Sequence, residues 1–339
     1  MQNRTLGRTG IKVSPYALGA MMFGAAAGVG NPDHDDATRI IHKALDAGIN
    51  FIDTADVYSY GESEEIVGAA LKGRRDSVVV ATKFGRPMGE DPNRQGGSRR
   101  WIMAAVEDSL RRLRTDYIDL YQIHRLDPDT ELEETLGALT DLLRSGKVRA
   151  IGSSNTPATS IVEAQWLAER RGLARPHTEQ PPYSLLNRGI EAEILPTAQR
   201  YGLGVLTWGP LAQGTLTGRI RPGRDTDLRR TAFFKHIADV RRVETVEKLI
   251  PLADEAGLSL IHLAMAFVTA HPGVTSALLG ARTMAQLDNL LAGLEVTLPG
   301  DLLDRIDEIV PPGTDVGALD QGYVSPAVRD PALRRRSLA

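Results

Sequence analysis

Short apolar runs alternate with helical patterns along most of the chain. Each run has the length of a strand, and the segment after it carries apolar residues at helical spacing. The pattern predicts eight strands, at residues 16–19, 50–53, 77–82, 117–123, 148–152, 177–180, 204–207 and 275–279. The first predicted helix is capped by Asp35 or Asp36 and ends at Gly48. Further helices are predicted near residues 62–72, 99–113, 131–145, 158–171, 189–201, 243–256, 259–270 and 283–293.

Repeating strand–helix units are typical of a parallel sheet. Eight of them favour a closed (β/α)8 barrel, the TIM barrel, and the pattern alone leaves an open doubly wound sheet as the alternative. Residues 3–13 contain two short runs that predict a β-hairpin closing the barrel floor, and an extra helix is predicted at 300–309. We therefore expect one barrel domain over residues 1–339. Residues 86–100 and 219–230 are interpreted as long loops, and 311–339 as a loosely docked tail.

Composition and charge restrict the class of protein. A length of 339 residues fits a single barrel. The 40 basic and 43 acidic residues nearly balance, whereas a protein that coats nucleic acid needs a basic excess. The absence of cysteine excludes disulfides, thiolate nucleophiles and cysteine-bound metals. The polar N-terminus and the lack of a long apolar stretch predict neither a secretory signal nor a membrane span. We expect a cytoplasmic protein with no nucleic-acid or membrane partner.

Ionisable residues follow three adjacent predicted strands at the end where a barrel holds its active site. Asp53 ends the second strand, Lys83 follows the third and His124 follows the fourth, while Tyr58 lies in the loop after Asp53. Taken singly, each has a commoner structural role as a helix cap, a rim charge, a packed histidine or a loop aromatic. Their convergence favours a catalytic interpretation.

These four residue types together can deliver a proton to an oxygen atom. A phenol ordinarily loses its proton only near pH 10, and an ammonium beside it favours the phenolate. Lys83 can supply that ammonium, Asp53 can keep it charged, and the His124 imidazole can orient a substrate oxygen by a hydrogen bond. A carbonyl protonated at oxygen still needs two electrons at carbon, so this set calls for a hydride donor such as a nicotinamide.

Three motifs carry a resemblance to a known family. Residues 51–64 read FIDTADVYSYGESE, residues 81–85 read ATKFG, and residues 116–124 read DYIDLYQIH. In order and spacing they resemble the signatures of the aldo-keto reductase superfamily, and the chain resembles its bacterial members near the channel β-subunit-like branch. The resemblance runs from about residue 5 to 312. It implies reduction of aldehydes or ketones with NADPH, with Tyr58 as general acid, Lys83 and Asp53 tuning it, and His124 orienting the carbonyl.

The cofactor site is also implied by the resemblance, because no GxGxxG motif follows a strand and residues 24–30 are interpreted as a flexible loop. Ser154, Asn155 and Gln180 would bind the nicotinamide carboxamide, although Asn155 could instead cap the next helix. Trp208 would lie against the nicotinamide, and residues 209–219 would bind the pyrophosphate. Arg282 and Gln286 would bind the adenosine 2′-phosphate. The other implied contacts are Ala20, Met21, Asp53, Gly209, Pro210, Leu211, Gln213, Gly214, Arg219, Gly280 and Asn289, the last at the adenine.

Three other functions remain open from the sequence. Lys83 could be the nucleophile of a Schiff-base lyase, which requires a neutral lysine. The chain could be a cofactor-binding regulatory subunit of a membrane channel. A metal hydrolase could use residues 34–36, or His124 with Asp127 and Asp129, although these acidic residues more simply cap helices. Substrate specificity is expected from Met21, Met22, Trp101 and the two long loops.

Overall fold

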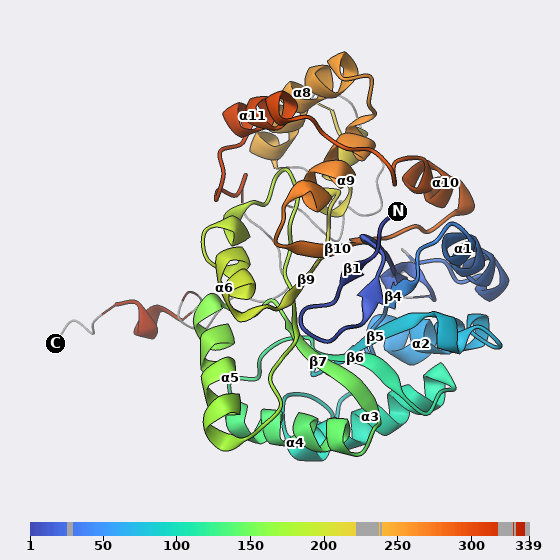
Figure 1. Cartoon of the computed structure of the whole chain (residues 1–339), viewed down its shortest axis with the longest axis vertical. Coiled ribbons are helices and arrows are strands. Elements are labelled where there is room, and N and C mark those ends of the chain that lie inside the picture. Colours follow the sequence, from blue (N-terminus) through green and yellow to red (C-terminus); the bar gives the residue numbers. More distant parts are fainter. Residues whose placement is uncertain (26–29, 222–236, 238, 318–327, 329, 336–339) are drawn as a thin grey trace.

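The computed structural model describes residues 1–25, 30–221, 237, 239–317, 328 and 330–335. Eight parallel strands close into one barrel, which confirms the predicted (β/α)8 fold (Figure 1). The order around the barrel follows the sequence, and the last strand pairs with the first. The strands are β3 (Tyr16–Gly19), β4 (Phe51–Asp53), β5 (Val79–Phe84), β6 (Ile118–Ile123), β7 (Val148–Ser154), β8 (Thr178–Gln180), β9 (Gly204–Thr207) and β10 (Val274–Leu279).

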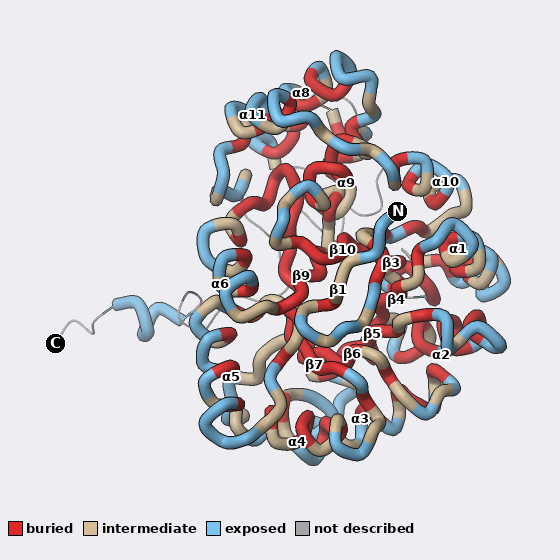
Figure 2. The backbone as a smooth tube through the Cα atoms, in the orientation of Figure 1, coloured by how far each residue is buried: buried red, intermediate tan, exposed pale blue. Residues whose placement is uncertain are grey.

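Helices surround the barrel, and their apolar faces cover its outer wall (Figures 1 and 2). They are α1 (His34–Asp46), α2 (Glu62–Ala70), α3 (Arg99–Leu113), α4 (Leu132–Arg144), α5 (Ala158–Arg171), α6 (Ile194–Tyr201), α8 (Val240–Glu255), α9 (Leu260–Ala270), α10 (Met284–Ala292) and α11 (Gly300–Ile309). Besides shifts of a few residues in the bounds of several elements, two details differ from the prediction. Asp33, rather than Asp35 or Asp36, caps α1, because its side chain accepts from the Asp36 amide. The helix predicted at 189–201 is divided into the short helix η5 (Gly189–Glu191) and α6.

The predicted N-terminal hairpin closes the barrel floor. Strands β1 (Arg4–Thr5) and β2 (Lys12–Val13) pair antiparallel, and Leu6 and Val13 pack on the apolar residues inside the barrel. A Cβ at Gly7 would come within 2.5 Å of the His177 carbonyl and 2.9 Å of the Gly204 amide. The turn therefore lies directly against the beginnings of β8 and β9, where only glycine fits.

Alternation along the strands divides the barrel interior into two layers. Phe51, Ala81, Leu120 and Ala150 point inward and form an apolar lower layer with the hairpin. Because side chains on one face of a strand recur every second residue, the next inward positions toward the strand ends share one upper layer. These positions are polar or glycine. Lys83, Gln122, Gly152 and Thr178 follow one another in register, whereas Asp53, at the end of β4, is paired with Ala81 one step lower and contacts Lys83 from there. The fold thus places the candidate site on a rigid apolar base.

The start of the C-terminal tail is firmly docked, which corrects the interpretation of a loose tail for residues 311–316, while residues 318–327, 329 and 336–339 of that tail lie outside the described residues. Arg188, in the loop after β8, donates to Asp307 Oδ1 and to the Val310 carbonyl, both at 2.6 Å. Backbone hydrogen bonds join Arg188 to Thr314 at 2.9 Å and Val316 to Leu186 at 2.9 Å. Residues 310–316 are therefore attached to the loop after β8. Farther along, the short helix η8 (Pro331–Leu333) is exposed.

Within the part of the chain that the structure describes, no single helix is long and apolar enough to cross a bilayer. Helices α8 and α9 pass a length and composition test only as a pair bent by 92°.

Candidate active site

A buried ion pair forms the base of the site. Lys83 is the second-last residue of β5 and Asp53 is the last residue of β4, and both side chains are 1% exposed. Lys83 Nζ donates to Asp53 Oδ1, to the Thr54 carbonyl at 2.8 Å and to the Tyr58 hydroxyl at 3.3 Å. The ammonium thus holds the phenol oxygen and the carboxylate in one arrangement.

Electrostatics keep Lys83 protonated. Burial alone would lower the pKa of Lys83, but the adjacent Asp53 carboxylate and the Tyr58 oxygen outweigh it, so the pKa lies above its ordinary value. A Schiff-base nucleophile needs the opposite, a neutral amine. The salt bridge between Lys83 and Asp53 therefore argues against the Schiff-base alternative.

Tyr58 is presented by a strained turn. It begins the short helix η3 (Tyr58–Gly61), in which Ser59 and Tyr60 have positive φ angles of 50° and 53°. Left-handed backbone at residues other than glycine costs about 1–3 kcal/mol each and gathers at functional sites. Ser59 Oγ ties this turn to the Phe23 carbonyl at 3.1 Å, and the Tyr58 side chain remains half-buried beside Lys83.

His124 follows β6 and faces Tyr58 edge-on, with the ring centroids 5.8 Å apart. Burial, reinforced by the charges of Lys83, Arg125 and Arg86, holds the pKa of His124 well below its ordinary value. The imidazole is therefore neutral at physiological pH and carries one N–H. A neutral imidazole of this kind can donate a hydrogen bond to a carbonyl oxygen without competing for its proton.

A second set of predicted residues is joined by hydrogen bonds to the Lys83–Asp53 ion pair. Trp208 Nε1 donates to Asn155 Oδ1 at 3.1 Å, and Asn155 Nδ2 donates to Ser154 Oγ. Ser154 Oγ donates to the Gln180 carbonyl at 2.8 Å, and Gln180 Nε2 donates to Asp53 Oδ2 at 2.8 Å. The alternative role of Asn155 as a helix cap is wrong, because Pro157 occupies the cap position of α5.

The segment after Trp208 suits close approach of a phosphate. Gly209 has a φ of 69°, and a Cβ placed there would meet nothing within 4 Å, so its backbone borders open space. The short helix η6 (Ala212–Thr217) begins with three residues at positive φ, namely Ala212, Gln213 and Gly214. Pro210 is buried and Leu211 half-buried, while Arg219 is exposed. Of the loop predicted at 219–230, residues 222–230 lie outside the described residues.

The predicted phosphate-binding residues lie where α10 begins, after β10 and Gly280. Thr283 caps α10, the Arg282 amide donates to Gln286 Oε1 at 2.8 Å, and the Arg282 carbonyl accepts from Asn31 at 3.0 Å. Within the described part of the chain, no acidic side chain pairs with the Arg282 guanidinium. Asn289 is exposed on α10, one to two turns farther along.

Other predicted residues have different surroundings. Trp101 is 3% exposed and packs in the core, so the expectation that it sets substrate specificity is wrong. Ala20 and Met22 are buried, whereas Met21 is 44% exposed after β3.

The residues of the metal alternatives are engaged elsewhere. His34 pairs with Glu62 at 2.7 Å, and Asp127 accepts from the Gly97 amide and from Thr130. Over the described ranges, His, Asp and Glu side chains do not gather into a group of three or more that could hold a metal.

Sequence reasoning assigned no role to two buried polar residues, of which Gln122 belongs to the site. Gln122 Nε2 is a second donor to Asp53 Oδ2, at 3.2 Å. Its position two residues before His124, in phase with the strand, could have identified it. Glu64 is completely buried and accepts from Thr82 at 2.5 Å and from Arg112 at 2.7 Å, which ties α2 to β5 and α3.

Comparison with known proteins identifies the family. Residues 16–311 match the model of the aldo/keto reductase family. The chain belongs to the aldo-keto reductase family. It is 40% identical to the uncharacterized oxidoreductase YrpG of Bacillus subtilis, covering 92% of this chain and 96% of that protein. It is 38% identical to a probable voltage-gated potassium channel subunit beta of Oryza sativa subsp. japonica, covering 91% of this chain and 97% of that protein. It is 36% identical to the aldo-keto reductase YhdN of Bacillus subtilis, covering 86% of this chain and 88% of that protein. Family membership makes this aldo-keto reductase an oxidoreductase of carbonyl compounds.

Proposed function

We propose that this aldo-keto reductase reduces aldehydes or ketones to alcohols with NADPH, and that Tyr58 is the general acid. The observation that carries the proposal is the contact between the Tyr58 hydroxyl and the Lys83 ammonium, whose charge is maintained by buried Asp53. This arrangement stabilises the phenolate that remains after the proton leaves.

Each residue of the proposed machinery has one task. Neutral His124 donates a hydrogen bond that orients the carbonyl oxygen toward Tyr58. Tyr58 gives its proton to that oxygen, and Lys83 stabilises the resulting phenolate. Gln122 and Gln180 hold Asp53, which in turn fixes Lys83. The charge that develops on the substrate oxygen is thus met by groups already in place.

The residues present fit a nicotinamide cofactor. Ser154, Asn155 and Gln180 offer hydroxyl and amide groups at one place, beside the Trp208 ring. Gly209 borders open space, and Arg282 offers a cation at the start of a helix, which suits a phosphate. When bound, the reduced nicotinamide supplies the hydride that the protein side chains lack.

A substrate survey tests the reaction class. We expect a panel of aldehydes and ketones to be reduced by the wild-type protein, followed by the loss of reduced-nicotinamide absorbance with NADPH and with NADH. The absence of turnover with every carbonyl and both cofactors would contradict the proposal.

A regulatory subunit is the second candidate function. It is favoured by the 38% identity to a protein named as a probable potassium channel subunit beta. Cofactor binding without turnover, together with co-purification of a membrane partner, would support this candidate over the reductase.

Cofactor choice provides a prediction for Arg282. NADPH differs from NADH only in the 2′-phosphate, which needs a cationic, hydrogen-bonding partner. We expect wild type to prefer NADPH and Arg282→Ala to lose about ten- to a hundredfold in NADPH affinity, the range of a lost charge-assisted hydrogen bond. NADH affinity should barely change. Titration followed by quenching of tryptophan fluorescence measures both.

Arg219→Ala is the matched control for Arg282. Arg219 is proposed to lie near the pyrophosphate, which both cofactors contain, so this variant should weaken both alike. Equal losses of NADPH and NADH affinity in Arg282→Ala would remove Arg282 from the proposed role, as would a wild type that binds NADH equally tightly.

A further inference from the structure

Glu179 is a completely buried carboxyl group that the proposed chemistry does not use. It lies in β8 between Thr178 and Gln180, whose side chains point into the barrel, so its own side chain points outward. There it meets Ser153, which faces outward from the neighbouring strand β7 in the same register.

The Glu179 carboxyl bridges both ends of a short turn. Ser153 Oγ donates to Glu179 Oε2 at 2.5 Å, and the Thr156 amide donates to Glu179 Oε1 at 2.9 Å. The two residues between these anchors are Ser154 and Asn155. Asn155 has a φ of 57°, a left-handed conformation that asparagine tolerates better than most residues but that the surrounding contacts still have to maintain.

We propose that Glu179 is a positioning residue for the nicotinamide site, because it clamps the Ser154–Asn155 turn from behind. The inference rests on the proposed function, in which these two side chains bind the carboxamide. Glu179 does not touch the cofactor in this proposal. It fixes the backbone from which Ser154 reaches the Gln180 carbonyl and Asn155 reaches Trp208.

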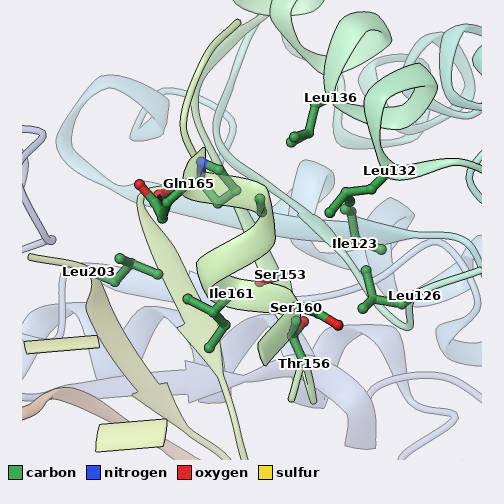
Figure 3. A pocket seen from close by; sticks show the side chains of 12 residues that line it. Ile123, Leu126, Leu132, Leu136, Ser153, Thr156, Ser160, Ile161, Gln165 and Leu203 are labelled. Atoms are coloured by element: carbon green, nitrogen blue, oxygen red, sulfur yellow. Dashed lines mark hydrogen bonds between the residues drawn. The ribbon is translucent and has the colours of Figure 1, made fainter. Parts of the chain in front are cut away.

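Little space for water lies beside the two hydrogen-bond partners of Glu179. Ser153 and Thr156 line a narrow cavity between the barrel wall and the helices α4 and α5, and most of its other lining residues are apolar (Figure 3). Its volume is about 10 Å³, so it has room for at most about one water molecule. Burial raises the pKa of Glu179 to about 7, against the opposing effects of Ser153, Thr156 and the charge of Arg125.

The clamp does not require the charge. A neutral carboxyl can accept from the Thr156 amide with one oxygen and donate to Ser153 Oγ with the other. Glutamine can make the same two bonds, whereas leucine can make neither. The conservative and the disruptive variants therefore separate a positioning role from an electrostatic one.

The test is a titration of wild type, Glu179→Gln and Glu179→Leu with NADPH, NADH and adenosine 2′,5′-bisphosphate, which lacks the nicotinamide. We expect Glu179→Leu to lose about ten- to a hundredfold in affinity for both cofactors, because the turn that the two hydrogen bonds hold in wild type must then be ordered at the expense of binding. Affinity for the bisphosphate should be unchanged, and Glu179→Gln should stay within a few fold of wild type. At saturating cofactor, kcat of Glu179→Leu should be largely retained.

Stability measurements accompany the titration. Asp119→Leu is the matched control, because Asp119 also bridges neighbouring strands, accepting from the Val80 amide at 2.9 Å, but lies at the opposite end of the barrel. It should lose thermal stability without losing cofactor affinity.

The raised pKa of Glu179 also predicts a pH dependence of stability. Because that pKa makes the wild-type fold less stable as pH rises from about 4.5 to 7, Glu179→Gln should gain in melting temperature relative to wild type over that interval.

Two results would overturn the inference while leaving the proposed function intact. One is a Glu179→Leu protein that binds NADPH as tightly as wild type. The other is a Glu179→Gln protein that loses as much affinity as Glu179→Leu. A third result would overturn the nicotinamide site itself, and the clamp with it. In that result the wild-type protein binds adenosine 2′,5′-bisphosphate, and it binds neither NADPH nor NADH more tightly than the bisphosphate.

Discussion

Replacing Tyr58 with phenylalanine should nearly abolish carbonyl reduction. The substitution removes the only proposed proton donor while keeping the ring beside Lys83 and His124. General acid catalysis contributes roughly 10²–10⁴-fold in rate, and we expect kcat to fall by that factor. Cofactor affinity should stay within a few fold, since the hydroxyl is not proposed to bind the cofactor. Steady-state kinetics and cofactor titration on the same preparation measure the two effects.

Tyr60→Phe is the matched control for Tyr58→Phe. Tyr60 lies in the same strained turn and loses the same atom, but its side chain is 77% exposed. Its kcat should resemble that of wild type. If Tyr58→Phe keeps more than about a tenth of wild-type turnover, and chemistry is shown to limit the rate, Tyr58 is not the general acid.

The barrel and its four central residues could be predicted from the sequence because both depend on short-range regularities. Apolar runs with helical segments between them identify strands, and a parallel barrel brings all the strand ends to one face. Lys83 illustrates this: the predicted strand ended at residue 82, the observed strand β5 ends at Phe84, and Lys83 still lies at the end of the strand. An error of two residues in the predicted end of a strand therefore does not move a side chain to another face of the barrel.

Features that depend on contacts between distant segments could not be predicted in the same way. Trp101 lies in the first turn of α3, beside a predicted loop, and only the packing of α3 on the barrel buries it. The docking of residues 310–316 depends on Arg188, whose partners lie far along the chain. Glu179 resembles an ordinary strand charge until Ser153 and Thr156 are brought against it.

The ion pair beneath Tyr58 provides the second large prediction. Lys83→Met should lower kcat by an amount comparable to Tyr58→Phe, because the phenolate then lacks its neighbouring cation. Asp53→Asn should also be severe. Each single variant leaves a buried charge without its partner, which typically costs about 3–5 kcal/mol of stability. Kinetics must therefore be read together with thermal melts.

The double variant Asp53→Asn/Lys83→Met separates the two effects. It removes both charges, so its stability should recover relative to the single variants, since replacing a buried pair is often close to neutral. Activity should not recover, because Tyr58 still lacks the ammonium. Asp53→Asn should be the more destabilising single change. Gln122 and Gln180 still donate to Asp53 when Lys83 is lost, whereas after Asp53→Asn the ammonium is left with neutral acceptors alone, namely the Thr54 carbonyl, the Tyr58 oxygen and the new amide oxygen. A folded Lys83→Met protein with full activity would contradict the ammonium-assisted mechanism, and recovery of both stability and activity in the double variant would reduce the pair to a structural element of the barrel.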